Sequence, residues 1–230
     1  MHSELLISVL KLTSHGATSI SQIAAYGHLP VSVAKRELKE LVEHGLVSIQ
    51  NDVVESAEDQ RLKIAVKAVR LGVDIERVCR FLEWQEFENV AIFALESNFF
   101  ETRRHFKFKW SRQWREIDVL GFRQPVILSV DCKHWRHSWQ PSAMSKVVEA
   151  QIGRTKALSK VLLKIRGNIG IEKWESAELL PVVLTLGKPP FNFYKDVPVV
   201  PIFQFRSFIN GLPTLVNYLA AFKVKLRASK

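Results

Sequence analysis

Three charged residues lie inside two short apolar segments near the middle of the chain. Asp118 belongs to the β-branched segment 116–122, and Asp131 and Lys133 belong to the segment 126–135. Burying an unpaired charge is costly unless a partner or a metal ion compensates it. A single charge of this kind is usually half of an ion pair within a sheet, whereas three together favour a chemical site.

Both segments have the composition of buried strands, and the residues between them are typical of a turn. The run Gly-Phe-Arg-Gln-Pro at 121–125 separates them, which predicts a hairpin. Because side chains alternate along a strand, Asp131 and Lys133 share one face, roughly 6.6 Å apart, while Cys132 points the other way. A carboxylate on the neighbouring strand reaches the same place, so Asp118 is expected beside them.

The order of these residues resembles the PD-(D/E)XK nuclease superfamily, which includes restriction endonucleases, archaeal Holliday junction resolvases and RecB-like nucleases. The shared pattern is an aspartate about a dozen residues before an Asp-x-Lys tripeptide on the next strand, here Asp118 followed by Asp131 and Lys133. The segments that look most like the RecB-like and Mrr-like branches are 84–88, 116–119 and 131–135.

Two further positions follow from the resemblance alone. Glu88 is expected to be the helix glutamate, because the residues around it match the way RecB-like nucleases place theirs, although Glu86 and Glu96 fit the same description. Gln151 corresponds to the helix glutamine of that branch, or else it caps a main-chain carbonyl in the core. The family has a tyrosine four residues later, where this chain has Thr155.

The resemblance implies a metal-dependent DNA endonuclease or exonuclease that hydrolyses phosphodiester bonds in DNA repair, recombination or defence. Mg²⁺ or Mn²⁺ would be bound by Asp118, Asp131, the backbone carbonyl of Cys132 and Glu88. The ion and Lys133 would orient and activate a water for in-line attack. The expected catalytic residues are Glu88, Asp118, Asp131, Lys133 and Gln151. The alternative is a nuclease fold with weak or lost catalysis that binds DNA, or a transcription or repair factor, as a regulatory platform.

Positive charge is concentrated around this site. The chain carries a formal net charge of +10, and residues 100–166 contain fifteen Lys or Arg against five Asp or Glu. Such a field suits a phosphate backbone and predicts DNA as the partner, although lysines on an edge strand also deter aggregation. The expected DNA-binding residues are Arg103, Arg104, Lys107, Lys109, Arg112, Arg136, Arg154, Lys156, Lys160 and Lys164.

An α/β domain over residues 74–230 is expected to position these residues. A helical stretch at 74–95 precedes an edge strand at 103–115, in which basic residues alternate with aromatic ones. After the hairpin, the pattern predicts a helix at 142–165, strands at 180–186 and 199–203, and a helix at 207–222. The resemblance implies that these elements form a restriction-endonuclease-like mixed sheet flanked by helices.

A small, mostly α domain precedes it. The predicted elements are a helix at 3–13, one beginning near 19, one at 31–44 and a hairpin at 46–55, which together resemble a winged-helix domain over residues 1–57. Residues 58–73 are expected to form a linking helix. Because residues 1–73 contain eight Lys or Arg and eight Asp or Glu, this domain is either a DNA-binding wing or a module for protein contacts or homodimerisation.

Composition excludes several other classes of protein. A hydrophobic content of 47% is enough for a core, and no apolar run approaches the length that spans a bilayer. Glu4 precedes the first apolar run, unlike in a signal peptide, so we expect a cytoplasmic, nucleoid-associated protein without a membrane partner. Two cysteines, Cys79 and Cys132, provide neither a disulfide framework nor a zinc site.

Overall fold

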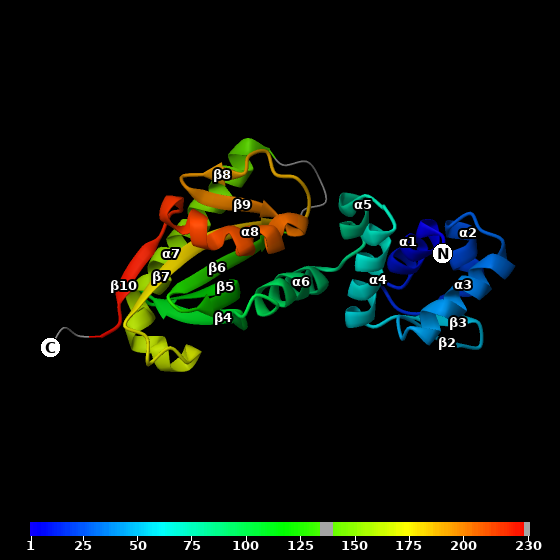
Figure 1. Cartoon of the computed structure of the whole chain (residues 1–230), viewed down its shortest axis with the longest axis horizontal. Helices are drawn as coiled ribbons and strands as arrows, with labels where there is room; N and C mark the ends of the chain where they lie inside the picture. The colour runs from blue at the N-terminus through cyan, green and yellow to red at the C-terminus, as the bar shows by residue number, and fades with distance from the viewer. Residues whose placement is uncertain (134–139, 228–230) are drawn as a thin grey trace. The chain divides into compact units, whose positions relative to one another are not determined.

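The computed structural model describes residues 1–133 and 140–227, and the chain forms two compact units, Met1–Phe87 and Glu88–Lys230 (Figure 1). The division falls within helix α6 (Trp84–Glu96), whereas the second domain was expected from the sequence to begin at residue 74. Among the described residues, no helix is both long enough and apolar enough to cross a membrane.

The first unit combines helices with a small antiparallel sheet. Its elements are α1 (Ser3–Leu12), β1 (Thr18–Ser19), α2 (Ile20–Tyr26), α3 (Val31–Glu43), β2 (Ser48–Gln50), β3 (Val53–Glu55), α4 (Glu58–Arg70) and α5 (Ile75–Cys79). The strand order is β1-β3-β2. Asn51 and Asp52 turn between β2 and β3 with φ angles of 49° and 62°, the left-handed conformation that a two-residue hairpin turn requires. The first unit is therefore mainly helical with a small three-stranded sheet, and its resemblance to a winged-helix domain stays a prediction.

Local signals explain how these helices begin and where they pack. Ser19 caps α2 through a capping box with Gln22, which satisfies the free amide groups at the start of the helix. The apolar faces of α1, α2 and α3 form the core, where Leu5, Ile23 and Leu38 are fully buried. Helix α4, expected as a linker, packs against α1 within this unit.

The second unit is built on a mixed sheet. Its strands are β4 (Glu101–Trp110), β5 (Gln113–Arg123), β6 (Val126–Lys133), β7 (Ser176–Thr185), β8 (Phe193–Tyr194), β9 (Val197–Pro201) and β10 (Phe222–Lys225). They follow the order β4-β5-β6-β7-β9-β8, and β10 pairs with β7. The β4–β5 and β5–β6 pairs are antiparallel, while β6–β7 and β7–β9 are parallel. The predicted mixed sheet, with β4 at its edge, is therefore confirmed.

Helices cover both faces of this sheet. The long helix α7 (Pro141–Ile169) packs its apolar stripe, including Leu158 and Leu162, against β5, β6 and β7. Leu95 of α6 meets the opposite face at Gly121, where an added Cβ atom would lie 3.0 Å from it. Helix α8 (Ile202–Leu215) lies in front of β7 and β9 in Figure 1 and is followed by the short helix η1 (Val216–Tyr218).

Several segments differ from the sequence expectations: the edge strand expected at 103–115 ends at Trp110, and the helix expected at 207–222 is Ile202–Leu215. The stretch 74–95 is not continuous, because it divides into α5 and α6. No strand was predicted after residue 222, but Phe222–Lys225 forms β10, antiparallel to the first residues of β7. Alternating Phe222 and Val224 pack on the core while Lys223 and Lys225 face solvent, so four residues were too few for a strand signal.

Candidate functional site

The β5–β6 hairpin brings together the three charged residues that the sequence singled out. The register pairs Val119 with Val130 at the end of the paired segment. Asp118 and Asp131 are the next residue on each strand, so they lie beside each other. Lys133 Nζ lies 2.9 Å from Asp131 Oδ2, and the backbone amide of Cys132 donates to Asp118 Oδ2 at 2.8 Å. Asp131 is only 3% exposed. Strand alternation places these groups together, as expected.

Helix α7 adds an amide and a guanidinium to this site. Gln151, which is fully buried, donates from Nε2 to the carbonyl and the hydroxyl of Ser129 at 2.6 and 3.0 Å. Its Oε1 accepts from Arg154 Nε at 2.8 Å, and Arg154 Nη2 donates to Asp131 Oδ1. Gln151 therefore both caps a core carbonyl and orients a site residue. The role of Arg154 was missed, although its i, i+3 spacing from Gln151 was a readable signal.

Burial and a neighbouring carboxylate both act on Asp118. Burial, and secondly the charge of Asp131, raise the pKa of Asp118 to about 6, while the Cys132 amide, Lys133 and Arg154 oppose the shift. The pKa of the Cys132 thiol is raised well above its usual value by burial and by the charges of Asp118, Glu88 and Asp131.

Glu88 is the buried carboxylate that α6 contributes. It is fully buried and accepts from Arg104 Nε at 2.8 Å, while His105 Nε2 lies 3.3 Å away. His105 also bonds Glu116 through Nδ1 at 2.9 Å. Its φ angle of 47° is left-handed, which is uncommon for a residue other than glycine, although histidine adopts it more often than most. Nothing in the sequence pattern had pointed to His105.

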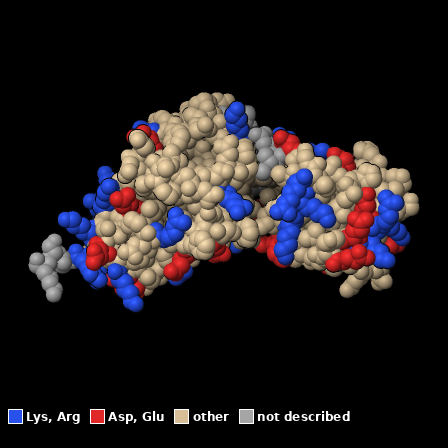
Figure 2. All heavy atoms as spheres, in the orientation of Figure 1, with Lys and Arg blue, Asp and Glu red and all other residues tan. Residues whose placement is uncertain are grey.

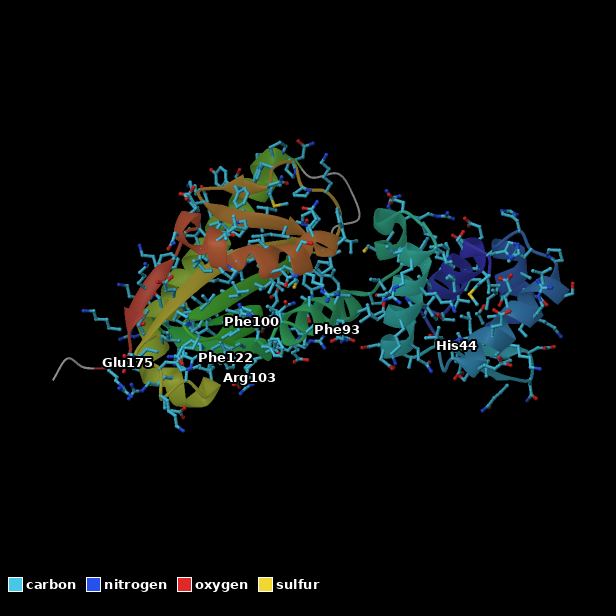
Figure 3. All side chains as sticks on the ribbon, in the orientation of Figure 1. His44, Phe93, Phe100, Arg103, Phe122 and Glu175 are labelled. Carbon is cyan, nitrogen blue, oxygen red and sulfur yellow. The ribbon has the colours of Figure 1, made fainter. Side chains whose placement is uncertain are left out.

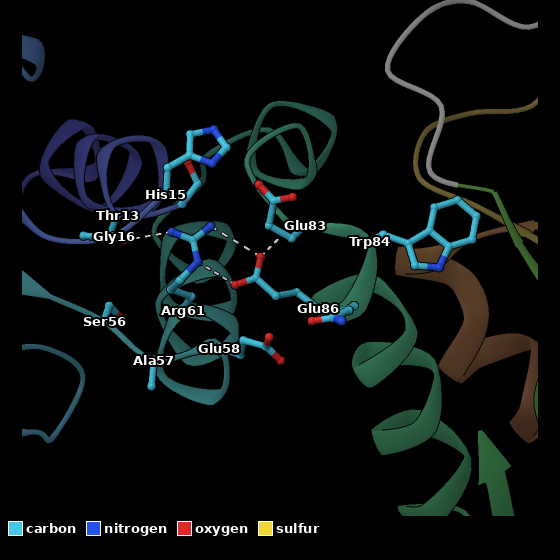
Figure 4. Close-up of a pocket in the computed structure, with 12 residues that line it drawn as sticks. Thr13, His15, Gly16, Ser56, Ala57, Glu58, Arg61, Glu83, Trp84 and Glu86 are labelled. Atoms are coloured by element: carbon cyan, nitrogen blue, oxygen red, sulfur yellow. Dashed lines mark hydrogen bonds and ion pairs between the residues drawn. The ribbon is translucent and has the colours of Figure 1, made fainter. Parts of the chain in front are cut away.

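The two alternative glutamates have other roles. Glu86 belongs to the first unit, where its Oε1 accepts from Arg61 Nε at 2.5 Å and its Oε2 from the Glu83 amide at 2.6 Å (Figure 4). Arg61 also donates to the Leu10 and Phe81 carbonyls. This network forms one wall of a pocket of about 710 Å³, and its hydrogen bonds are satisfied within the protein. Glu96 accepts from Thr102 near the surface.

The expected DNA-binding residues occupy three kinds of position. Arg104 and Arg154 lie within the site, where each bonds a carboxylate. Arg103 stacks over the Phe122 ring, 5.3 Å from its centroid (Figure 3). The exposed members are Lys107, Lys109, Arg112, Lys156, Lys160 and Lys164. Arg136 lies outside the described residues. On the visible face of the first unit, acidic side chains are interspersed with basic ones (Figure 2).

The residues at the hairpin suit a hard divalent cation. Among residues 1–133 and 140–227, no three His, Cys, Asp or Glu side chains converge as a metal group. The donors available here are two carboxylates, Asp118 and Asp131, and the Cys132 carbonyl. Mg²⁺ is usually held by one or two carboxylates and keeps several waters. A cation beside the two carboxylates would also relieve the repulsion that raises the pKa of Asp118.

Comparisons with known proteins give the chain no family. No protein-family model matches it, and no curated protein matches it. The crystal structure of protein VC1899 from Vibrio cholerae is similar over 94% of this chain and 52% of that chain, with a TM-score of 0.41 and 9% sequence identity. This chain therefore spans about half the length of VC1899. The fold and the site define a mixed α/β protein with a mainly helical first unit, a small three-stranded sheet and a cluster of charged residues at one end of the β5–β6 hairpin.

Proposed function

We propose that this protein is a metal-dependent deoxyribonuclease that hydrolyses phosphodiester bonds. The observation that carries the proposal is the convergence of Asp118, Asp131 and Lys133 at one end of a buried hairpin, with Lys133 Nζ 2.9 Å from Asp131. The pKa of Asp118, raised first by burial and then by the charge of Asp131, favours a functional site over a structural ion pair. The basic residues around the hairpin support a polyanionic substrate.

The residues of the chain have distinct roles in this proposal. Asp118, Asp131 and the Cys132 carbonyl would hold Mg²⁺ or Mn²⁺, with Glu88 nearby as a further carboxylate. When bound, the ion supplies charge neutralisation and activation of a water. Lys133, which is about one-fifth exposed (21%), orients that water and offsets negative charge at the phosphate. Gln151 and Arg154 are positioning residues, because they fix the carboxylate of Asp131.

One observation favours a second candidate function. Asp131 is engaged by both Lys133 and Arg154, and Glu88 by Arg104, so internal cations already neutralise two of the carboxylates. A protein with this arrangement could use the fold as a platform that binds DNA or a transcription or repair factor without cutting. Under either function we propose DNA as a partner, a homodimer or protein contact through the first unit, and a cytoplasmic, nucleoid-associated location.

Cleavage assays with Mg²⁺ or Mn²⁺ on duplex, single-stranded and branched DNA test the proposal. Asp131→Asn and Lys133→Ala should each lower cleavage by at least about 100-fold, because both groups act at the reacting phosphate, while DNA affinity stays within about two-fold. The matched control is Glu149→Gln, an exposed carboxylate on α7 that pairs with Lys195. Absence of cleavage of every DNA form, together with no divalent-metal binding by calorimetry, would favour the platform instead.

A further inference from the structure

The tip of the β4–β5 hairpin is tightly built. Ser111 and Arg112 join the strands with φ angles of 49° and 65°, and Trp110 pairs with Gln113 directly behind them. Two successive left-handed residues are the signature of a two-residue hairpin turn whose twist matches that of the strands. Neither residue is a glycine, so the turn has little conformational freedom. The residues next to it are held in a defined position.

The two sides of this hairpin differ in character. Phe106, Phe108 and Trp110 pack against the core beneath α7, and Phe108 is only 3% exposed. Trp114, by contrast, leaves 70% of its surface in solvent. It lies directly opposite Lys109 in the strand register, and Lys109 is exposed as well. One set of aromatic rings therefore anchors the hairpin, and the anchored hairpin presents a single indole to solvent.

Cations surround that indole. Residues 107–116 contain four Lys or Arg and one acidic residue, Glu116. Lys107, Arg115 and Glu116 line with Trp114 a hollow of about 420 Å³. Among the described residues, the buried Nε of Arg115 has no hydrogen-bond partner. That nitrogen faces away from Trp114, because Arg115 lies opposite the core residue Phe108 in the strand register and side chains alternate along the strand. Lys107 and Lys109 share the face of Trp114, so the cations beside the indole are these two lysines.

We infer that Trp114 is a stacking platform for an unpaired nucleobase, with Lys107 and Lys109, on the same face of the hairpin, holding the phosphates of the same strand. Within a duplex both faces of a base are covered by its neighbours, so an exposed indole stacks on bases of a single strand, an overhang or a frayed end. The inference rests on the proposed function for its nucleic-acid partner and narrows the substrate to DNA with unpaired nucleotides. The excess of cations favours a polyanion over an apolar protein partner.

The test uses the full chain with a single-stranded oligonucleotide that carries one 2-aminopurine, whose fluorescence is quenched by stacking. Wild type should quench it, and Trp114→Phe should retain most of the effect because an aromatic face remains. Trp114→Leu should abolish the quenching and lower single-strand affinity on the order of ten-fold, with the salt dependence and the affinity for blunt duplex unchanged. The matched control is Tyr218→Leu, an aromatic residue of the same unit that is 78% exposed.

The outcomes separate this inference from the proposed function. The stacking platform would be overturned, even if the protein cleaves DNA, by either of two results. One is a Trp114→Leu variant that binds single strands as tightly as wild type, and the other is a Trp114→Phe variant that quenches 2-aminopurine no better than Trp114→Leu does. Equal losses on single-stranded and duplex DNA would overturn it too, because stacking requires an unpaired base. Failure of the wild-type protein to bind any nucleic acid would contradict both the stacking platform and the proposed deoxyribonuclease function. Circular dichroism of each variant confirms that the fold is retained.

Discussion

Each buried carboxylate of the hairpin is held by a specific partner. Asp131 is held by Lys133 and Arg154, whereas Asp118 accepts from the backbone amide of Cys132 and has a pKa raised to about 6. The folded protein therefore holds this proton up to about pH 6, while an unfolded aspartate releases it near pH 3.9, as is typical. As the pH rises between those values, the free energy of unfolding contributed by Asp118 falls.

Replacing Asp118 should remove the loss of stability that ionisation of this carboxyl causes at high pH. In EDTA at pH 8, Asp118→Asn should raise the free energy of unfolding by on the order of 1 kcal/mol, because the neutral amide avoids the repulsion from Asp131. At pH 4 the gain should vanish, since Asp118 is then protonated in the wild-type protein. Urea denaturation at both pH values measures this, with Asp59→Asn, an exposed carboxylate, as the control. An equal gain in the free energy of unfolding at both pH values would contradict the raised pKa of Asp118.

At the scale of elements, α7 serves both the site and the surface. Its inner face contributes Gln151 and Arg154, and its outer face presents Lys156, Lys160 and Lys164 at i, i+4 spacing. Like charges at this spacing destabilise a helix by a few tenths of a kcal/mol, so a polyanionic partner accounts for the column better than helix stability does.

Neutralising the column tests whether it contacts phosphate. Each phosphate contact contributes about −0.9 to the slope of log affinity against log salt on duplex DNA and about −0.7 on single strands. Replacing the three lysines with Gln should flatten the slope measured by fluorescence anisotropy by up to about 2.7 on duplex DNA. The same exchange at Lys35, Lys39 and Lys63 of the first unit should leave it unchanged. An unaltered slope in the column variant would show that α7 does not contact the backbone.

At the scale of the whole molecule, we propose that the first unit acts through protein contacts. Its wing, residues 47–55, contains no Lys or Arg, and Lys35 of α3 pairs with Asp52 at 3.1 Å. Glu37, in the middle of α3, is buried and accepts from the amide and the ring of His2. A wing that follows a phosphate backbone normally offers at least one cation. Two chains joined through this unit would place two sites on one substrate.

We therefore predict that the full chain is a dimer and that its first unit contributes little DNA affinity. Sedimentation velocity over a range of concentrations should show twice the chain mass. Arg36→Ala with Lys39→Ala, both exposed on α3, should change DNA affinity by less than about two-fold. A monomeric protein whose sequence-selective binding is lost in this variant would instead make α3 the base-reading helix.

Much of the fold follows from local pattern. Apolar periodicity and turn residues predicted α1, α3, α7 and the β5–β6 hairpin, because each depends on which face of a short segment is buried. Strand alternation placed Lys133 beside Asp131, and the turn brought Asp118 to the neighbouring strand. These relations span two to about a dozen residues, a range over which backbone geometry alone fixes relative positions.

Only the tertiary structure decided the partners of the buried charges. Arg154 reaches Asp131 across 23 residues, Arg104 reaches Glu88 across 16, and Arg61 reaches Glu86 across 25. Glu86 and Glu88 are two residues apart in one helix, yet they serve different units, a distinction that composition does not encode. The physical reason is that no repeating pattern in the sequence identifies the partner of a buried charged side chain. The partner depends on how the helices pack on the sheet, and this packing involves residues that are distant in sequence.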